Sequence, residues 1–263
     1  MPTLICFHAH PDDESLTTGG IIARYASRGH RVVVVIATGG ELGEVPKDLG
    51  DASLVDRRRE ETECSARALG AHRVAWLGYR DSGMTGWEDN GHAEAFMNVD
   101  ADAAATRLAG ILVEEHADTL TVYDWHGNYG HPDHIKVHHV GHRAAELAGT
   151  PYVYEATANR DVMRGLIEAA KASGMDVEDF DPDGPSDDGN PFGTPDAEIT
   201  TAVDVSAFLA QKRASIACHQ SQISDTSMFL TMPEEVFAAV MGTEWFIRVG
   251  ATPDSRETEL AGL

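Results

Sequence analysis

Two short motifs of this sequence combine histidine and aspartate around a proline: AHPDDE at residues 9–14 and YGHPDH at residues 129–134. Each motif follows a run typical of a buried β-strand, TLICFH at 3–8 and TLTVYD at 119–124. Imidazole nitrogens and carboxylate oxygens are ligands of catalytic zinc ions. Strand ends of an α/β sheet form the crevice in which such sheets bind ligands. The two motifs therefore predict a metal site at the strand ends.

We predict three metal ligands from the two motifs. His10 and Asp13 flank a turn that begins a helix, so both side chains can point into one crevice. A proline, which favours the first position of a helix, places His134 in the first turn of a second helix at the same level. His138 and His142 lie one and two turns deeper, and we interpret them as residues that pack or support the ligands. Three protein ligands leave one position for water.

The remaining polar residues of the motifs suggest acid–base roles. Asp12 lies between two ligands and is predicted to be the general base. His131 is predicted to stabilise an oxyanion and to protonate a leaving amine, working as an imidazolium whose pKa is held up by Asp133. Asp133 is also expected to orient a ring or a helix end. Glu14 is expected to act through its charge at a helix N-terminus.

The elements that must position these residues alternate along the chain. Strands are predicted at 4–8, 31–37, 73–77, 119–123 and 151–155, and helices at 14–28, 53–69, 101–115, 132–148 and 161–173. Glycines 29, 70 and 149 follow three of these helices, as left-handed caps do. This pattern predicts an α/β fold, a Rossmann-like, doubly wound and mainly parallel sheet with helices on both faces. The segment after the first strand reads HPDDE instead of GxGxxG, which disfavours dinucleotide binding.

The second part of the chain adds a loop and an extension. Residues 176–198 are rich in Asp, Gly and Pro and are expected to form a long loop, either a solvated flap or a lid. A strand at 199–205, helices at 207–219 and 233–241, and a strand at 245–249 are expected to follow. We predict one domain over 1–263, with the metal site in a core of 1–160, the acidic loop at 176–198 and a C-terminal extension at 199–263.

Composition and charge exclude some classes of partner and indicate where the protein is located. The net charge is −23, with 43 acidic and 20 basic side chains, so nucleic acid and anionic membranes are disfavoured as partners. No apolar run approaches the length of a membrane span, and the N-terminus lacks a signal-peptide pattern, so we expect a cytoplasmic protein.

Cys6, Cys64 and Cys218 are expected to be buried thiols. Whether the chain forms a homo-oligomer is left open.

AHPDDE together with GHPDH resembles the PIG-L/LmbE-like zinc deacetylases, which remove acyl groups from N-acetylglucosamine-type sugars. The resemblance covers roughly the first 160 residues well. It implies one zinc ion held by His10, Asp13 and His134, with Asp12 as base and His131 as acid or oxyanion stabiliser. It also implies a small N-acyl amino sugar as the substrate.

Further segments resemble the branch of that family that makes and processes mycothiol. RREETECSARALG at 58–70 is similar to a helix whose arginine meets the sugar, which implies this role for Arg58. YRDSGM at 79–84 implies that Asp81 accepts sugar hydroxyls, and Tyr129 matches a mobile tyrosine at the rim. KRASIACHQSQ at 212–222 is similar to a C-terminal helix whose histidine, here His219, approaches the site. Trp125, His126 and Asn128 are candidates for the pocket wall without assigned roles.

Several alternatives share these ligands. Two histidines and a carboxylate also occur in non-haem iron oxygenases, but those are expected to be all-β proteins. A two-metal phosphoesterase would use more carboxylates. A sugar-binding module that lacks turnover would not need Asp12 and His131. A mycothiol-type thiol-conjugate amidase remains an alternative to a deacetylase, and Fe²⁺, Co²⁺ or Ni²⁺ could replace zinc at the same ligands.

Overall fold

The computed structural model describes residues 1–172, 180–252 and 254–263. The strands are β1 (Thr3–His8), β2 (Arg31–Thr38), β3 (Arg73–Tyr79), β4 (Thr119–Tyr123), β5 (Tyr152–Thr157), β6 (Thr201–Asp204) and β7 (Thr243–Arg248). The helices of the first half are α1 (Asp13–Thr17), α2 (Gly19–Ser27), α3 (Leu54–Leu69), α4 (Ala101–Glu114), α5 (Gly127–Gly130) and α6 (Pro132–Ala148). Those of the second half are α7 (Arg160–Ala172), α8 (Leu209–Ile216), α9 (Met228–Thr231) and α10 (Glu234–Met241). Short 3₁₀ turns lie at Glu88–Gly91, Phe96–Asn98, Asp196–Glu198 and Ser206–Phe208.

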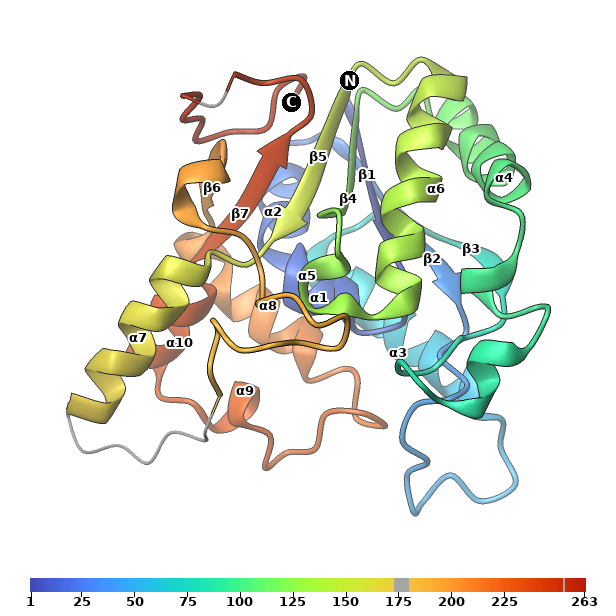
Figure 1. Cartoon of the computed structure of the whole chain (residues 1–263), viewed down its shortest axis with the longest axis horizontal. Helices are drawn as coiled ribbons and strands as arrows, with labels where there is room; N and C mark the ends of the chain where they lie inside the picture. Colours follow the sequence, from blue (N-terminus) through green and yellow to red (C-terminus); the bar gives the residue numbers. More distant parts are fainter. Residues whose placement is uncertain (173–179, 253) are drawn as a thin grey trace.

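The described strands form one seven-stranded sheet in the order β3-β2-β1-β4-β5-β7-β6 (Figure 1). Neighbours from β3 to β5 are parallel, whereas β7 is antiparallel to both β5 and β6. The chain runs from β1 outward to β3 and resumes at β4 on the other side of β1. A sheet that changes its direction of growth opens a crevice at the carboxyl ends of the two central strands. The predicted fold class is confirmed, and both motifs follow these central strands.

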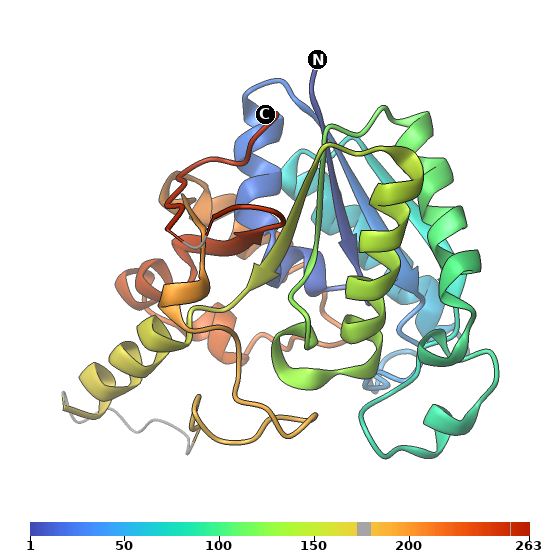
Figure 2. The same cartoon turned by 45° about the horizontal axis from the view of Figure 1, so that its top comes forward.

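Helices cover both faces of the sheet (Figure 2). The face under α4 and α6 buries alternate residues of β1, such as Ile5 and Phe7, together with Leu108 and Val137. The opposite face buries the intervening residues, such as Leu4 and Cys6, against α2. Because β1 is buried on both faces, its sequence is apolar throughout, as in other central parallel strands. A third cluster lies between α8 and α10.

The predicted helix over 14–28 is wrong in one respect, because it is divided. The chain breaks at Thr18, whose φ is −129° and ψ 8°, so α1 and α2 are separate helices. The hydroxyl of Thr18 lies 2.8 Å from Nε2 of His8 at the end of β1. The predicted left-handed glycines are present at Gly29, Gly70 and Gly149, with φ of 83°, 78° and 69°. The remaining predicted helices and strands are present within a few residues of their expected bounds.

The N-terminus of α2 is held by a buried ion pair from the C-terminal extension. Glu244 of β7 accepts hydrogen bonds from the backbone N–H groups of Gly20 and Ile21 at 2.7 and 2.8 Å. Its Oε1 lies 2.5 Å from Nζ of Lys212, and the side chains of this pair are only 3% and 2% exposed. The carboxylate therefore both caps a helix and neutralises a buried ammonium group.

We expect Lys212→Ala to lower the free energy of unfolding by about 3–5 kcal/mol, because it leaves the carboxylate of Glu244 buried without its partner. Urea denaturation followed by circular dichroism measures this change. The matched control is Arg143→Ala, which breaks the exposed pairs of Arg143 with Asp102 and Glu146 and should lower the stability far less. Equal losses in the two variants would contradict a stabilising role for the buried pair.

The described part of the acidic loop packs against the segment before the second motif. The backbone N–H of Asp187 donates to the carbonyl of Tyr129 at 3.0 Å, and that of Gly193 donates to the carbonyl of Asn128 at 2.7 Å. Arg160 of α7 donates to the carbonyls of Phe192 and Gly193 at 2.7 and 2.6 Å. Positions 176–179 of the predicted loop lie outside the described residues. From 180 onward the loop supports the turn that carries Tyr129.

The prediction of buried thiols is wrong for two of the three cysteines. Cys64 of α3 and Cys218 just beyond α8 form a disulfide, with their Cα atoms 5.7 Å apart. Their separation of 154 residues gave no local signal for this pairing. Cys6 is a free and buried thiol, as predicted, and burial raises its pKa to about 12. The disulfide joins the core to the C-terminal extension.

Candidate metal centre and active site

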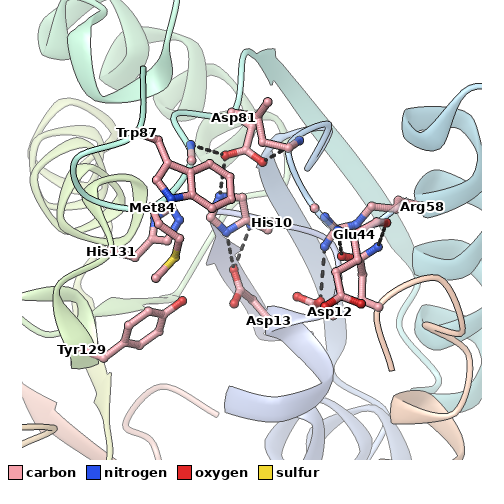
Figure 3. Close-up of a pocket in the computed structure, with 14 residues that line it drawn as sticks. His10, Asp12, Asp13, Glu44, Arg58, Asp81, Met84, Trp87, Tyr129 and His131 are labelled. Atoms are coloured by element: carbon pink, nitrogen blue, oxygen red, sulfur yellow. Dashed lines mark hydrogen bonds and ion pairs between the residues drawn. The ribbon is translucent and has the colours of Figure 1, made fainter. Parts of the chain in front are cut away.

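A cavity of about 390 Å³ opens at the carboxyl ends of β1 and β4 (Figure 3). The predicted site residues that line it are His10, Asp12, Asp13, Arg58, Asp81, Tyr129 and His131. His134 lies just beneath its wall, with its ring 5.5 Å from that of His10 and 5.1 Å from that of His131. The two motifs, which are far apart in the sequence, thus meet in one cavity.

Two of the predicted metal ligands, His10 and His134, point toward the carboxylate of the third, Asp13. Oδ2 of Asp13 lies 3.5 Å from Nδ1 of His10 and 3.4 Å from Nε2 of His134. A donor atom of His131 also lies within 4.8 Å of donor atoms of His10 and His134. The carboxylate of Asp13 is therefore central to the group, and His131 borders it.

In both His10 and His134, one ring nitrogen contacts a neighbouring oxygen outside the ligand group and the other faces Oδ2 of Asp13. Nδ1 of His134 lies 3.3 Å from the carbonyl of Gly127, which can only accept, so Nδ1 carries the proton. Nε2 of His134 is buried and has no hydrogen-bond partner among the described residues. Nε2 of His10 faces the carboxylates of Asp133 and Asp81 at 3.2 and 3.4 Å, which leaves Nδ1 directed at Oδ2 of Asp13. Metal-binding histidines are usually oriented in this way through their other nitrogen. The residues present therefore fit a metal ion.

The electric field of the site also favours a cation. Burial acts to lower the pKa of His10, but Asp81, Asp13 and Asp133 hold that pKa well above its usual range. Burial acts to raise the pKa of Asp13, but His134 and His10 hold it well below its usual range. The Asp13 carboxylate thus stays ionised between the two histidine ligands. Such a pocket stabilises a positive charge.

Asp12 lies beside the ligands and is held in an unusual conformation. Its φ is 98°, and its backbone N–H donates to Oε2 of Glu14 at 3.0 Å. Nη2 of Arg58 lies 3.2 Å from Oδ2 of Asp12, and Nη1 of Arg58 donates to the carbonyl of Gly40 at 2.7 Å. Burial raises the pKa of the Asp12 carboxyl to about 6, and Arg58 opposes this rise. An aspartate with such a pKa is suited to accept a proton near neutral pH.

The sequence prediction for the charge of His131 is wrong. The backbone N–H of Asp133 donates to Nδ1 of His131 at 3.1 Å, so this ring caps α6. The carboxylate of Asp133 instead contacts His10 and accepts from the backbone N–H of Ser82 at 2.9 Å. Burial, followed by His10 and His134, lowers the pKa of His131 to about 2. His131 is therefore a neutral ring with its proton on Nε2, a hydrogen-bond donor at the cavity wall.

The other predicted residues fall at different depths. Asp81 is 4% exposed and is oriented by the backbone N–H of Gly83, which donates to its Oδ1 at 2.8 Å. Tyr129 directs its hydroxyl into the cavity (Figure 3), and its ring lies 5.0 Å from that of His134. Glu14 is fully buried and lies behind Asp12. Its Oε1 lies 2.7 Å from Nε2 of His219, so His219 supports Glu14 and does not line the cavity.

Sequence reasoning missed part of the cavity wall. The additional lining residues are Leu42, Gly43, Glu44, Gly83, Met84, Trp87 and Gln222. They come from loops whose conformation has no sequence periodicity, although Met84 and Gln222 lie in segments quoted above. Trp125, His126 and Asn128 are not among the lining residues. The ring of His126 instead faces the acidic loop, with Nδ1 3.5 Å from Asp188.

Curated relatives match nearly the whole chain. One from Thermobispora bispora is 36% identical over 95% of this chain and 88% of its own length. One from Acidothermus cellulolyticus is 37% identical over 98% of this chain and 94% of its own length. Both are named 1D-myo-inositol 2-acetamido-2-deoxy-alpha-D-glucopyranoside deacetylase. Identity at this level over full length shows common family membership.

Solved structures share the fold at lower identity. The N,N'-diacetylchitobiose deacetylase of Pyrococcus horikoshii is 22% identical, with a TM-score of 0.58 over 94% of this chain and 83% of that one. The 4-carboxy-2-hydroxymuconate hydratase GalB of Pseudomonas putida is 17% identical, with a TM-score of 0.59 over 96% and 98%. Because a deacetylase and a hydratase share this fold, the fold alone does not define the reaction. A family model described as "PIG-L: GlcNAc-PI de-N-acetylase" matches residues 5–145, and this chain therefore belongs to the PIG-L family.

Proposed function

We propose that this protein is a zinc-dependent amidohydrolase that removes the acetyl group from N-acetylglucosamine linked to inositol. One observation carries the proposal. Nδ1 of His10 and Nε2 of His134 lie 3.5 and 3.4 Å from Oδ2 of Asp13, and Asp12 lies beside them in the same cavity. The substrate class is that named for the full-length relatives. Acetate and a free amino sugar would be the products.

His10, Asp13 and His134 would hold the metal ion. When bound, such an ion acts as a Lewis acid and lowers the pKa of water in its open position. Zinc suits two imidazoles and a carboxylate, and Fe²⁺, Co²⁺ or Ni²⁺ could use the same ligands. Asp81 and Asp133 would keep the ring of His10 oriented through its Nε2.

The remaining groups would carry protons and stabilise charge. Asp12 would take a proton from the attacking water and later pass it to the departing amine. His131, neutral and protonated on Nε2, would donate a hydrogen bond to the oxyanion formed at the amide carbon. Arg58 would hold Asp12 in place through the contact at 3.2 Å. The amide bond would then break, the amine would leave with the proton from Asp12, and the acetic acid formed would release its remaining proton to give acetate.

We assign the sugar contacts to the cavity wall. The carboxylate of Asp81 already faces Gly83, Leu42 and His10, and it would accept sugar hydroxyls through its remaining lone pairs. Tyr129 would contact the sugar from the rim. The guanidinium of Arg58 already faces Asp12 and the carbonyls of Pro11 and Gly40. Arg58 would reach the sugar only through an N–H group that these partners do not use.

An amine-release assay tests the proposed function. The zinc-loaded protein is given N-acetylglucosaminyl inositol, N-acetylglucosamine, N,N'-diacetylchitobiose and a mycothiol conjugate, and amine and acetate are both measured. Equal amounts of both products, with the highest kcat/KM for the inositol glycoside, would support the proposal. Faster cleavage of the conjugate would favour the thiol-conjugate amidase. Absence of acetate from all N-acetyl sugars would contradict deacetylation.

We expect His131→Ala to retain the metal and to lower kcat by about 10²–10³-fold, because the oxyanion loses a donor. Since burial holds the pKa of His131 near 2, the ring is neutral throughout the assay range, and its removal should leave the shape of the pH profile unchanged. Metal analysis and a pH–rate profile measure both effects, and the exposed His139→Ala serves as control. A near-normal kcat would remove His131 from the mechanism.

We further propose that residues 1–263 act as one domain, because the extension at 199–263 adds β6 and β7 to the sheet and Gln222 to the cavity. No helix in the described part of the chain combines the length and apolarity needed to cross a membrane. A cytoplasmic location stays part of the proposal.

A further inference from the structure

A second group of metal-binding side chains lies outside the active-site cavity, where α6 packs on β5. It consists of His138 and His142, one turn apart on α6, and Glu155 on β5. A donor atom of each residue lies within 4.8 Å of those of the other two. The sequence analysis interpreted both histidines as packing residues. We propose that these three residues bind a second divalent transition-metal ion, with zinc as the favoured ion. This site is additional to the proposed function and does not depend on it.

The distances suit an ion between the three groups. Nε2 of His142 lies 2.9 Å from Oε1 of Glu155, and the ring of His138 lies beside the same oxygen, with its Nδ1 at 3.7 Å. Ligands at ~2.0–2.1 Å from a tetrahedral zinc ion lie roughly 3.3 Å apart. The rings of His138 and His142 are 4.3 Å apart, so both face the same side of the helix. Because Nδ1 of His138 bonds to Tyr123, the ring must shift so that Nε2 faces the ion.

The hydrogen bonding of His138 is an independent observation that points to a metal. Its Nδ1 lies 3.0 Å from the carbonyl oxygen of Tyr123, which can only accept, so Nδ1 carries the proton. Nε2 then keeps its lone pair, and no hydrogen bond to it exists within the described residues. A backbone carbonyl that fixes the tautomer of a histidine is the usual support of a metal ligand. Burial, followed by His142, also lowers the pKa of His138, which keeps its lone pair free.

The group is rigid and reachable from solvent. α6 and β5 follow each other directly, joined by the turn after the cap at Gly149. The side chains of His138, His142 and Glu155 are 15%, 28% and 14% exposed. An ion can therefore enter without unfolding, and it would join the helix to the strand. Three ligands with partial exposure leave room for water as the fourth, as in other open zinc sites.

The second site adjoins the catalytic group through Tyr123. The carbonyl of this residue accepts from His138, and its ring stacks on His134 at 4.3 Å with an angle of 10° between the planes. The two sites nevertheless have no ligand in common. Loss of one ion therefore need not remove the other, and the two can be separated by mutation.

Zinc titration of the untagged, chelator-stripped chain tests this inference, with a coloured zinc chelator as competitor. We expect the wild-type chain to bind a second, weaker equivalent of zinc. His138→Ala, His142→Ala and Glu155→Gln should each lose that equivalent and keep the first. The matched control is His139→Ala, which removes an exposed histidine of the same helix and should leave both equivalents. His134→Ala should show the opposite loss and keep the weaker equivalent.

Cobalt supports the assignment by a second readout, because an ion bound by two imidazoles and a carboxylate gives visible absorption bands. The active-site ion gives such bands at the first equivalent, so a further increase should appear at the second equivalent in the wild type and be absent in Glu155→Gln. Circular dichroism checks the fold of each variant. If an alanine variant fails to fold, the loss of the second equivalent in Glu155→Gln tests the ligand set. A single equivalent in the wild type overturns the inference. Retention of the second equivalent with unchanged affinity in any of the three variants overturns the ligand set.

Discussion

Asp12→Asn should lower kcat by about 10²–10⁴-fold while the chain keeps its active-site metal, because a positioned base contributes this much to the rate. The substitution is well matched to the site. Asparagine tolerates positive φ better than most residues, so it can replace a residue whose φ is 98°. Its amide retains the shape of the carboxylate but cannot accept a proton from water. Steady-state kinetics and metal analysis of the same sample measure the two effects.

The pH dependence gives Asp12 a second test. Burial raises the pKa of its carboxyl to about 6 in the metal-free chain, and a bound cation lowers this value. Asp12 acts in its ionised form, so the rate should fall as the pH decreases through that pKa, at or below about pH 6. Because Arg58 lowers the same pKa, Arg58→Gln should move this acid limb to higher pH. Near-normal turnover in Asp12→Asn with full metal occupancy would exclude Asp12 as the base.

His134→Ala should lose the active-site metal and more than about 10³-fold of the turnover. The metal contributes several kcal/mol to the transition state, and each 1.36 kcal/mol is a factor of ten in rate. The side chain is buried at the start of α6, and its Nε2 has no other hydrogen-bond partner among the described residues. Removing it therefore deletes a ligand without breaking a hydrogen bond of that nitrogen. Metal analysis after dialysis against a weak chelator measures the loss.

His138→Ala is the matched control, since it removes a histidine one turn further along the same helix. It should keep turnover and the tightly bound active-site ion. Circular dichroism of both variants should match the wild type. If His138→Ala lost the active-site metal and His134→Ala kept it, our assignment of the third ligand would be wrong.

The main features of the fold and the ligand group could be predicted because they depend on local patterns. Alternating apolar strands and capped helices indicate the doubly wound sheet. The position of each motif directly after a strand then places His10, Asp13 and His134 at one edge. The side chains that line the cavity at Arg58, Asp81 and Tyr129 were implied by family resemblance and not by periodicity.

The features that were missed depend on contacts between distant segments. The break at Thr18 accompanies the cap from Glu244, which lies 224 residues from Gly20 in the sequence. The neutral state of His131 depends first on its burial, and the backbone N–H of Asp133, not the carboxylate, faces its ring. Trp87 and Gln222 reach the cavity from loops, where neither helical nor strand periodicity applies. Such details follow from tertiary packing.

The disulfide between Cys64 and Cys218 has a consequence for a chain that has been cut by a protease. The described acidic loop at 180–198 lies between the two cysteines in the sequence, and a cut there divides the chain into two fragments. The bond keeps these fragments covalently joined, and the extension still delivers Gln222 to the cavity. A nicked molecule would therefore migrate as one band on a non-reducing gel and as two bands after reduction.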